Sequence, residues 1–426
     1  MPGRSRKRPR FTTPKPTRKG VLLTLATAVL AWGGASSAAV NAFHFKAPSV
    51  ALALDADDPV ALVRDAQVRF NIGEIEGGSD EMLGIVRRSV SELALNGPAF
   101  RLYGLTSAAN ADLPAVRAQM EVSDQLERRD AAAQLWLIEN AVQQNDVNQA
   151  LRHYDTALRI QESSRALLYP ALTGSLESPL IRERFLPYLN APPPWLDSFL
   201  RYAVSNTQSP TAIAELARLS GGFPDGPAYS SLDRELLTQL VAFEEYEAAI
   251  EHFSGITEAN QAVLTDLALT DDTTDNAFAP ITWQPFQIDG IETFLLASPA
   301  GGGAVEIEAE VEAGYKGPVA RKLMAFAPGE YALQADLRAE GFNRPDRVRW
   351  TIRCAGQTDI LPLLRSEEIL AEEFRLTARF SVPAGCPVQT LMVSADTVVS
   401  TGYVKLVLGE VTTGPVASDT AEETAR

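Results

Sequence analysis

Histidine and cysteine are scarce in this sequence, which has three histidines and two cysteines in 426 residues. The histidines, His44, His153 and His252, are far apart, and none has a histidine or cysteine three or four residues away, as a helical metal site requires. The sequence also has no nucleophile elbow, Walker loop, dinucleotide-binding glycine motif, HExxH or paired CxxC. We therefore predict no metal, no other cofactor and no catalytic residue, and we expect a protein that is not an enzyme.

Basic residues are also few, with 38 Lys and Arg against 54 Asp and Glu and a formal net charge of −16. Eight of the basic residues lie in residues 1–19, which contain no acid, so the rest of the chain has 30 basic residues against 54 acidic ones. An acidic body repels a phosphate backbone, so we expect no nucleic-acid partner. Residues 1–19 are interpreted as a basic cytoplasmic tail.

One long segment carries no formal charge, the 23 residues from Val21 to Phe43. As a helix it is long enough to cross about 30 Å of hydrocarbon, so residues 20–43 are predicted to be a transmembrane anchor. The basic residues before it place the N-terminus in the cytoplasm, which predicts a single-pass protein of the bacterial inner membrane with a periplasmic body. The alternative is a secretory signal cleaved near Ala38, Ala39 or Ala42, which would release a soluble exported protein.

The two cysteines fit an exported body. Cys354 and Cys386 lie in strand-like runs of one domain, and such a pair in an oxidising compartment predicts a disulfide. A closed loop of about 33 residues would stabilise the fold by about 3–4 kcal/mol in the chain-entropy model. The alternative is two buried free thiols.

Residues 50–258 have a helical pattern, with apolar residues at spacings of three and four that are interrupted by Gly, Pro and Asn-Asp. About twelve candidate helices are joined by short loops. Residues 137–158 align with residues 236–257 at an offset of 99, close to three periods of about 33. This period is typical of stacked helix–turn–helix repeats.

The segment resembles the tetratricopeptide repeat (TPR) family at Leu137, Asn145-Asp146 and the small and aromatic residues of the following helix, with a weaker copy near residues 246–253. The family's closing Pro is missing, so the array is described as TPR-like. The resemblance implies a surface that binds a protein partner. The residues expected to pack the repeats are Leu137, Ala150, Tyr154, Ala157, Ala249 and Phe253.

The pattern changes after residue 258. Residues 259–280 are rich in Thr and Asp and are predicted to be a linker. Residues 281–412 alternate apolar and polar side chains in about ten short runs, which predicts an antiparallel two-sheet sandwich. In one run, Leu333, Ala335 and Leu337 should face the core and the residues between them solvent. The small, polar residues 413–426 are expected to be a disordered tail.

The runs at residues 323–338, 374–383, 388–395 and 403–411 together resemble jelly-roll sandwiches of the carbohydrate-binding-module type. In such modules sugars stack on exposed aromatic side chains, which makes Trp283 the candidate sugar platform, whereas Trp350 is expected in the core. Four glutamates at alternate positions, Glu306 to Glu312, are interpreted as a solvated strand face.

The sequence thus predicts a multidomain protein: one N-terminal transmembrane helix, an all-α TPR-like array and an all-β, jelly-roll-like sandwich. The first functional hypothesis is a non-enzymatic, membrane-anchored periplasmic scaffold or adaptor that binds a protein partner through its helices. By resemblance, such proteins are associated with assembly of surface polysaccharide or other envelope complexes. The alternative is a carbohydrate-binding protein that acts through the sandwich and binds polysaccharide there. A hydrolase with acidic residues converging in one cleft remains a third hypothesis.

Overall fold

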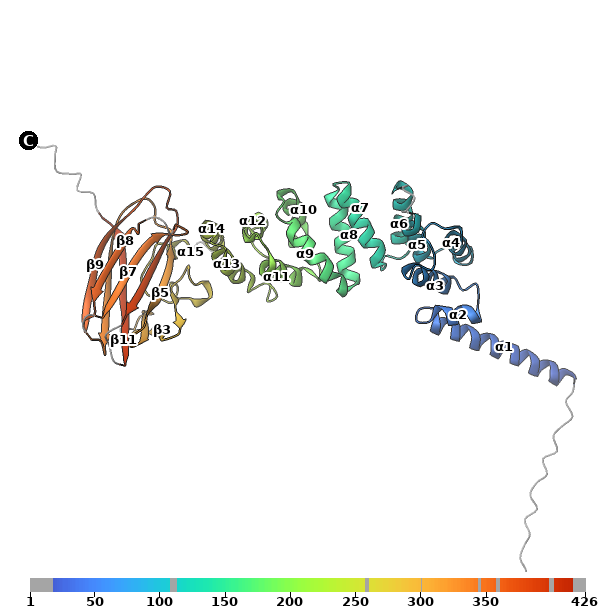
Figure 1. Ribbon diagram of the computed structural model, residues 1–426, viewed down its shortest axis with the longest axis horizontal. Coiled ribbons are helices and arrows are strands. Elements are labelled where there is room, and N and C mark those ends of the chain that lie inside the picture. Colours follow the sequence, from blue (N-terminus) through green and yellow to red (C-terminus); the bar gives the residue numbers. More distant parts are fainter. Residues whose placement is uncertain are drawn as a thin grey trace, which may run out of the picture. The chain divides into compact units, whose positions relative to one another are not determined.

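The computed structural model describes residues 18–107, 113–256, 260–299, 301–343, 346–357, 361–397 and 402–416. Helices come first along the chain and two antiparallel sheets follow, as the sequence predicted (Figure 1). The chain forms two compact units, residues 1–165 and 166–426. The helices that we expected to form one array over residues 50–258 are therefore divided between the units. Most of the expected tails, residues 1–17 and 417–426, lies outside the described residues.

The first unit is helical, and several of its helices begin at a side-chain cap. Asp58, Ser79, Asp130 and Asp146 each accept a backbone N–H of the following first turn, which satisfies a donor that the helix itself leaves unpaired. The elements are α1 (Arg18–Phe43), α2 (Pro48–Leu54), α3 (Pro59–Asn71), α4 (Asp80–Glu92), α5 (Gly97–Ser107), α6 (Leu113–Leu126), α7 (Ala131–Gln143), α8 (Val147–Ile160) and the short 3-10 helix η2 (Glu162–Ser164).

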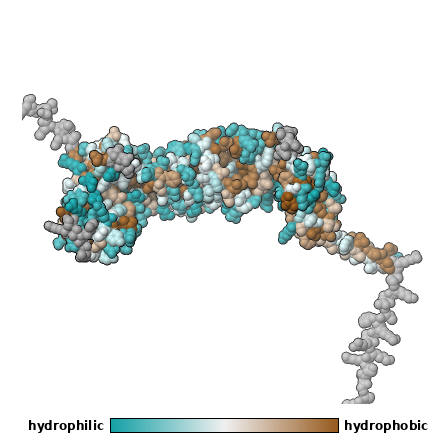
Figure 2. Space-filling model, viewed as in Figure 1, coloured by the Kyte–Doolittle hydropathy of each residue, from teal (hydrophilic) through white to brown (hydrophobic). Residues whose placement is uncertain are grey.

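Helix α1 contains the apolar segment Val21–Phe43, which is long and apolar enough to cross a membrane. Its side chains are mostly exposed, and Figure 2 shows it as a predominantly apolar rod. By length and composition the same segment also fits a signal sequence.

The second unit begins with helices that pack on one another in sequence. Neighbouring helices such as α13 and α14 are in contact, and so are α10 with α12, α11 with α13 and α12 with α14. The elements are α9 (Arg165–Ser175), α10 (Pro179–Asn190), α11 (Leu196–Asn206), α12 (Pro210–Ser220), α13 (Leu232–Ala242), α14 (Tyr246–Ile256), α15 (Asn260–Val263) and η3 (Asn276–Phe278).

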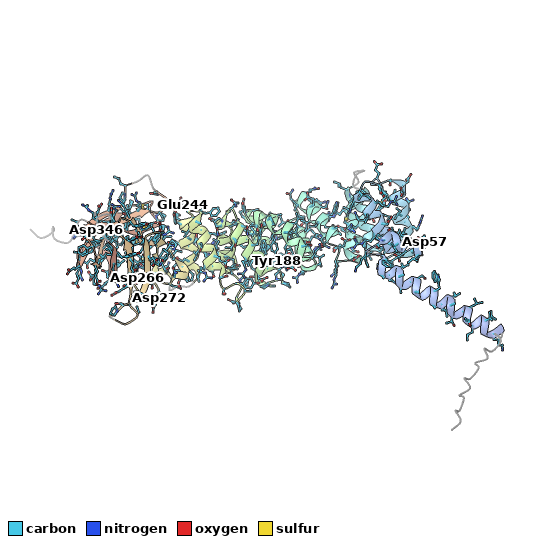
Figure 3. The ribbon with its side chains drawn as sticks, turned by 60° about the horizontal axis from the view of Figure 1, so that its bottom comes forward. Asp57, Tyr188, Glu244, Asp266, Asp272 and Asp346 are labelled. Carbon is cyan, nitrogen blue, oxygen red and sulfur yellow. A yellow bond between two sulfur atoms is a disulfide. The ribbon has the colours of Figure 1, made fainter. Side chains whose placement is uncertain are left out.

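The internal repeat at an offset of 99 is present in the structure. The turn between α7 and α8 contains Asn145 at φ 55°. The turn between α13 and α14 contains Glu244, labelled in Figure 3, at φ 60°. The backbone hydrogen bonds of the two turns join equivalent positions. A histidine of the second helix also contacts an equivalent residue of the first: His153 Nδ1 lies 2.8 Å from Gln134 Oε1, and His252 Nε2 lies 2.9 Å from Asp233 Oδ1.

The six residues expected to pack these hairpins are buried or half-buried. Tyr154 is half-buried, and burial followed by the nearby Glu139 carboxylate raises its pKa above the ordinary tyrosine value. The other five are buried: Leu137, Ala150, Ala157, Ala249 and Phe253.

The C-terminal sandwich has two antiparallel sheets, one ordered β1-β5-β10-β7-β8 and the other β2-β3-β4-β11-β6-β9. Leu333, Ala335 and Leu337 are buried between them, as the alternation predicted, and Trp350 is also in the core. The strands are β1 (Gln284–Pro285), β2 (Gln287–Ile288), β3 (Ile291–Ala297), β4 (Val305–Glu312), β5 (Lys316–Met324), β6 (Gly329–Glu340), β7 (Arg347–Cys354), β8 (Leu364–Ile369), β9 (Glu373–Val382), β10 (Gln389–Asp396) and β11 (Tyr403–Pro415).

The ends of β7 and β11 confirm one prediction and correct another. The Cys354–Cys386 disulfide is formed, and it joins the end of β7 to the turn before β10. The disordered tail was expected to begin at residue 413, which is wrong because β11 continues to Pro415. There the last residues of β11 pair with the first half of β6, from Tyr331 onward.

Residues 264–283, here called the connecting segment, pack on the sandwich. Leu267 and Leu269 belong to the sandwich core. Backbone hydrogen bonds join the segment to β4 and β5. Val305 N of β4 donates to Leu269 O (2.9 Å), Leu323 N of β5 donates to Pro280 O (2.6 Å), and Ala325 N, directly after β5, donates to Leu264 O (3.0 Å). The segment is therefore part of the sandwich fold and not the linker that we expected. The prediction was wrong because the segment is rich in Thr and Asp, and only a few apolar residues in it are buried.

Trp283 ends the connecting segment and corrects our prediction of a sugar platform. Its side chain is completely buried in the sandwich core, and its indole Nε1 donates to the carbonyl of Leu267 at 3.2 Å. A buried ring has no free face on which a sugar can stack. The sequence alone could not distinguish this aromatic residue from an exposed one, because its burial depends on a contact 16 positions earlier in the chain.

Lys322 of β5 is a charged residue buried where the sandwich meets the connecting segment. Its side chain has no exposed surface, and its Nζ donates to the carbonyl of Ile281 at 2.9 Å. Burial lowers the pKa of Lys322 to about 7, although the carboxylate of Asp266 nearby favours the charged form.

We predict that Lys322→Met changes how stability depends on pH. Between about pH 7 and pH 10.5 the unfolded chain binds a proton at Lys322 that the folded chain does not, so wild-type stability rises with pH in this window. The stability cost of burying the lysine is thus full below about pH 7 and disappears as the pH rises. Lys322→Met lacks this pH-dependent contribution to the free energy of unfolding, which changes by about 1.4 kcal/mol for each pH unit within the window.

The measurement is urea denaturation of both proteins at about pH 7 and about pH 9.5, where all other groups titrate alike in both chains. We expect wild type to gain stability relative to the variant by a few kcal/mol at the higher pH. An unchanged difference between the two proteins would contradict a depressed lysine pKa.

Candidate functional site

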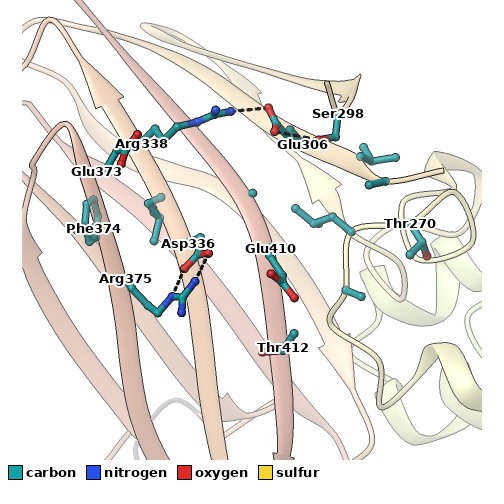
Figure 4. A pocket seen from close by; sticks show the side chains of 16 residues that line it. Thr270, Ser298, Glu306, Asp336, Arg338, Glu373, Phe374, Arg375, Glu410 and Thr412 are labelled. Atoms are coloured by element: carbon teal, nitrogen blue, oxygen red, sulfur yellow. Dashed lines mark hydrogen bonds and ion pairs between the residues drawn. The ribbon is translucent and has the colours of Figure 1, made fainter. Parts of the chain in front are cut away.

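The sandwich has a groove of about 740 Å³ over the outward face of the six-stranded sheet (Figure 4). On one side, β6 and β9 pair so that Asp336 lies opposite Arg375 and Arg338 opposite Glu373. The opposite wall includes residues 268–270 of the connecting segment, which are held to the start of β4 by the bridge between Thr270 and Ala304. We call this hollow the sandwich groove.

The floor of the groove is shaped by an irregularity in β11. Its register with β6 shifts between Leu408 and Val411, so two residues, Gly409 and Glu410, bulge where regular pairing is interrupted. Beyond the shift, β11 continues beside β6, whereas the pairs between β11 and β4 end at Leu408 and Ile307. The groove lies where β11 remains paired with β6 but no longer with β4, and Glu410 and Thr412 of β11 line its surface.

Two ion pairs hold the polar side chains of the groove in place. Arg375 donates through Nε and Nη2 to the two carboxylate oxygens of Asp336, at 2.5 and 2.6 Å. This hydrogen bonding lowers the pKa of Asp336 below its ordinary value. Arg338 donates to Glu306 at 2.8 Å, and Glu306 also accepts the hydroxyl of Ser298 at 3.1 Å (Figure 4). Bidentate pairing fixes the orientation of both partners.

The charge of the lining is unbalanced. Each of the two arginines is already paired with a carboxylate, whereas Glu373 and Glu410 have no ion-pair partner among the described residues. Among the described residues that line the groove, the only aromatic one is Phe374, which is half-buried and packs against the sandwich core. The groove can therefore donate and accept many hydrogen bonds, repels anionic groups and offers little aromatic surface.

Only part of this site was predictable from the sequence. Glu306 belongs to the predicted acidic face, of which Glu308 pairs with Lys405 at 2.8 Å outside the groove. The alternation also placed Asp336 on an outward face. The pair with Arg375, 39 positions away, depends on which strands become neighbours, and no local pattern shows this.

A second cavity, of about 360 Å³, lies among α12, α13 and α14 and is here called the helical cavity. It is lined by the His252–Asp233 pair and by Arg218, which contacts Glu215 at 2.6 Å and Glu251 at 3.9 Å. The ring of Phe223 meets His252 edge to face, with ring centroids 6.2 Å apart. With Asp225, the lining has four carboxylates and one arginine.

His153, the counterpart of His252, has a different environment. Burial, and secondarily the charge of Arg152, lower its pKa below the ordinary histidine value, which favours the neutral ring. Both histidines contact the preceding helix of their hairpins, as packing residues do. Within the described ranges, no group of three or more His, Cys, Asp or Glu side chains is arranged to hold a metal ion.

No protein-family model and no curated protein matches this chain. Among solved structures, the C-terminal region is similar to carbohydrate-binding modules. One is described as "CBM4 structure and function", with 17% identity, covering 30% of this chain and 96% of that one at a TM-score of 0.23. TmCBM61 in complex with β-1,4-galactotriose has 8% identity, with 34% and 94% coverage and a TM-score of 0.24. The CBM22-1 xylan-binding domain from Paenibacillus barcinonensis Xyn10C has 12% identity, with 32% and 86% coverage and a TM-score of 0.24.

Proposed function

We propose that this protein binds carbohydrate through the sandwich groove and does so without catalysis, as a membrane-anchored protein. The observation that carries the proposal is the groove itself: an open hollow on a rigid sheet, lined by charged side chains that are fixed by ion pairs. Strands hold such groups more precisely than loops do, which is what recognition of a polar ligand requires.

The chemistry of the lining suits a polyhydroxylated ligand. Each sugar hydroxyl donates one hydrogen bond and accepts others, and neighbouring hydroxyls match the spacing of a planar carboxylate or guanidinium. Arg375 uses Nε and Nη2 for Asp336, so further N–H groups and carboxylate lone pairs of this pair remain for hydroxyls. Because Phe374 offers little ring surface, recognition here relies on hydrogen bonds. The acidic balance favours glycans without carboxylate, sulfate or phosphate groups.

The packing of α1 argues against cleavage after Ala42, one of the three candidate signal-cleavage positions. Val40 of α1 is only 6% exposed and packs with Ala51 and Ala61 of the two following helices. Cleavage after Ala42 would remove Val40 and leave these partners uncovered. We propose that α1 spans the inner membrane, with residues 1–19 in the cytoplasm and the body in the periplasm.

We predict that Arg375→Ala and Asp336→Asn each weaken binding to a neutral glycan by about tenfold, which corresponds to one lost hydrogen-bonding group at about 1–1.5 kcal/mol. Lys405→Ala is the matched control, because Lys405 and Glu308 form a comparable exposed ion pair on the same sheet outside the groove. The measurement is calorimetry of the detergent-solubilised full chain against neutral and anionic oligosaccharides, followed by recovery of the glycan to test that it is uncleaved.

Equal losses in Lys405→Ala and the groove variants would contradict the proposed location, and binding by no neutral glycan would contradict the function. A shortened glycan after incubation would contradict the non-catalytic part of the proposal.

The helical cavity favours a second candidate function, the adaptor role in which the helices bind a protein partner. Its four carboxylates against one arginine suit a cationic segment of that partner. We predict that a photo-crosslinking residue in place of Glu251, whose side chain is 73% exposed at the cavity rim, forms one discrete protein adduct in cells. The control is the same residue in place of Leu167, which is exposed on α9. Identical adducts at both positions, or none at Glu251, would contradict the adaptor role.

A further inference from the structure

The hairpin formed by α1 and α2 places a second apolar helix beside the end of the candidate membrane span. Helix α2 begins at Pro48, five residues after α1 ends at Phe43, and packs against α1. The turn is fixed by two backbone hydrogen bonds of 2.8 Å, from His44 N to Val40 O and from Ala47 N to Phe43 O. Helix α2 is thus attached rigidly to the last turns of α1.

The length of α1 sets the level of this hairpin relative to a bilayer. The 23 residues Val21–Phe43 rise about 34 Å as a helix, slightly more than the hydrocarbon thickness of about 30 Å. The last turn of α1, and α2 packed against it, therefore fall at the boundary between hydrocarbon and headgroups. Helix α2 has 7 residues, too few to span the bilayer.

The outward surface of the hairpin is apolar. Val50 and Leu54 are both 46% exposed and, four positions apart, lie on one face of α2. Phe45 in the turn is 61% exposed. Residues 47–54 contain no charged side chain. In water, adjoining exposed apolar side chains are unfavourable and mark a surface that contacts something else.

Two basic residues flank this surface. Lys46 is exposed in the turn, and the guanidinium carbon of Arg64 lies 5.5 Å from the centre of the Phe45 ring. At the boundary of a bilayer, aromatic rings lie at headgroup level, and Lys and Arg side chains reach the lipid phosphates.

We propose that Phe45, Val50 and Leu54 form a lipid-contacting surface, so that α2 lies in the interfacial layer of the bilayer. The inference rests on the membrane anchor of the proposed function. Lipid is the occupant because the surface continues directly from the candidate span and has cationic residues at its Phe45 end. The exposed Asp55 and Asp57 follow its Leu54 end, where the chain leaves the bilayer boundary. The first unit is then held against the membrane instead of moving freely on a tether.

The test uses spin labels on single cysteines, because the described chain has no free cysteine and its disulfide does not react with the label. Val50→Cys and Leu54→Cys report on the surface. Leu30→Cys on α1, 76% exposed, reports on the span, and Val142→Cys on α7, 54% exposed, is the matched control for an apolar residue in water. Full-length protein is reconstituted in phosphatidylcholine–phosphatidylglycerol nanodiscs, and collisions of each label with oxygen and with a water-soluble nickel chelate are measured.

We expect oxygen-to-nickel accessibility ratios at residues 50 and 54 several-fold above that at residue 142 and below that at residue 30. Ratios at 50 and 54 equal to that at 142, with residue 30 in lipid, would overturn the lipid contact and leave the anchor intact. A label at residue 30 that is accessible to nickel, or lost by cleavage, would overturn both the anchor and the inference.

Discussion

Burial of the connecting segment against the sandwich is the contact on which the second unit depends. Trp283, Leu267 and Leu269 complete the core between the sheets, and each fully buried leucine contributes about 2 kcal/mol. The segment also supplies the carbonyl of Ile281 to Lys322, a buried donor that would otherwise be unsatisfied. Within this segment η3 packs against α13, and Phe278 meets Phe253 of α14 edge to face, so the same segment joins the last helices of the unit to the sandwich.

The sandwich groove depends on the same contact. Residues 268–270 of the connecting segment form one wall, and the hydrogen bond from Val305 to Leu269 holds that wall at the start of β4. The opposite wall, with Asp336 and Arg375, belongs to the sheet itself. A sandwich that began at residue 281 would retain the ion pairs but would lose the wall that makes the surface concave.

Local patterns in the sequence predicted the features whose causes are local. The alternation of β6, the Cys354–Cys386 pair and the repeated hairpins follow from neighbouring residues or from export. Features that depend on distant contacts were missed or misplaced. Trp283 was taken for an exposed platform because its partner lies outside the domain boundary that we had drawn. The groove was missed because the Asp336–Arg375 pair requires the strand order of the folded sheet.

Hydrogen–deuterium exchange of the full-length protein tests most directly whether the connecting segment belongs to the sandwich fold. The relevant amides are those of Thr274 and Trp283, bonded to Thr270 O and Thr273 O within the segment, and that of Leu323, bonded to Pro280 O. We expect these amides to exchange as slowly as those of β10, because they open only when the sandwich opens. Fast exchange across residues 264–283, with β10 still protected, would show a flexible linker and contradict the burial of the segment in the sandwich fold.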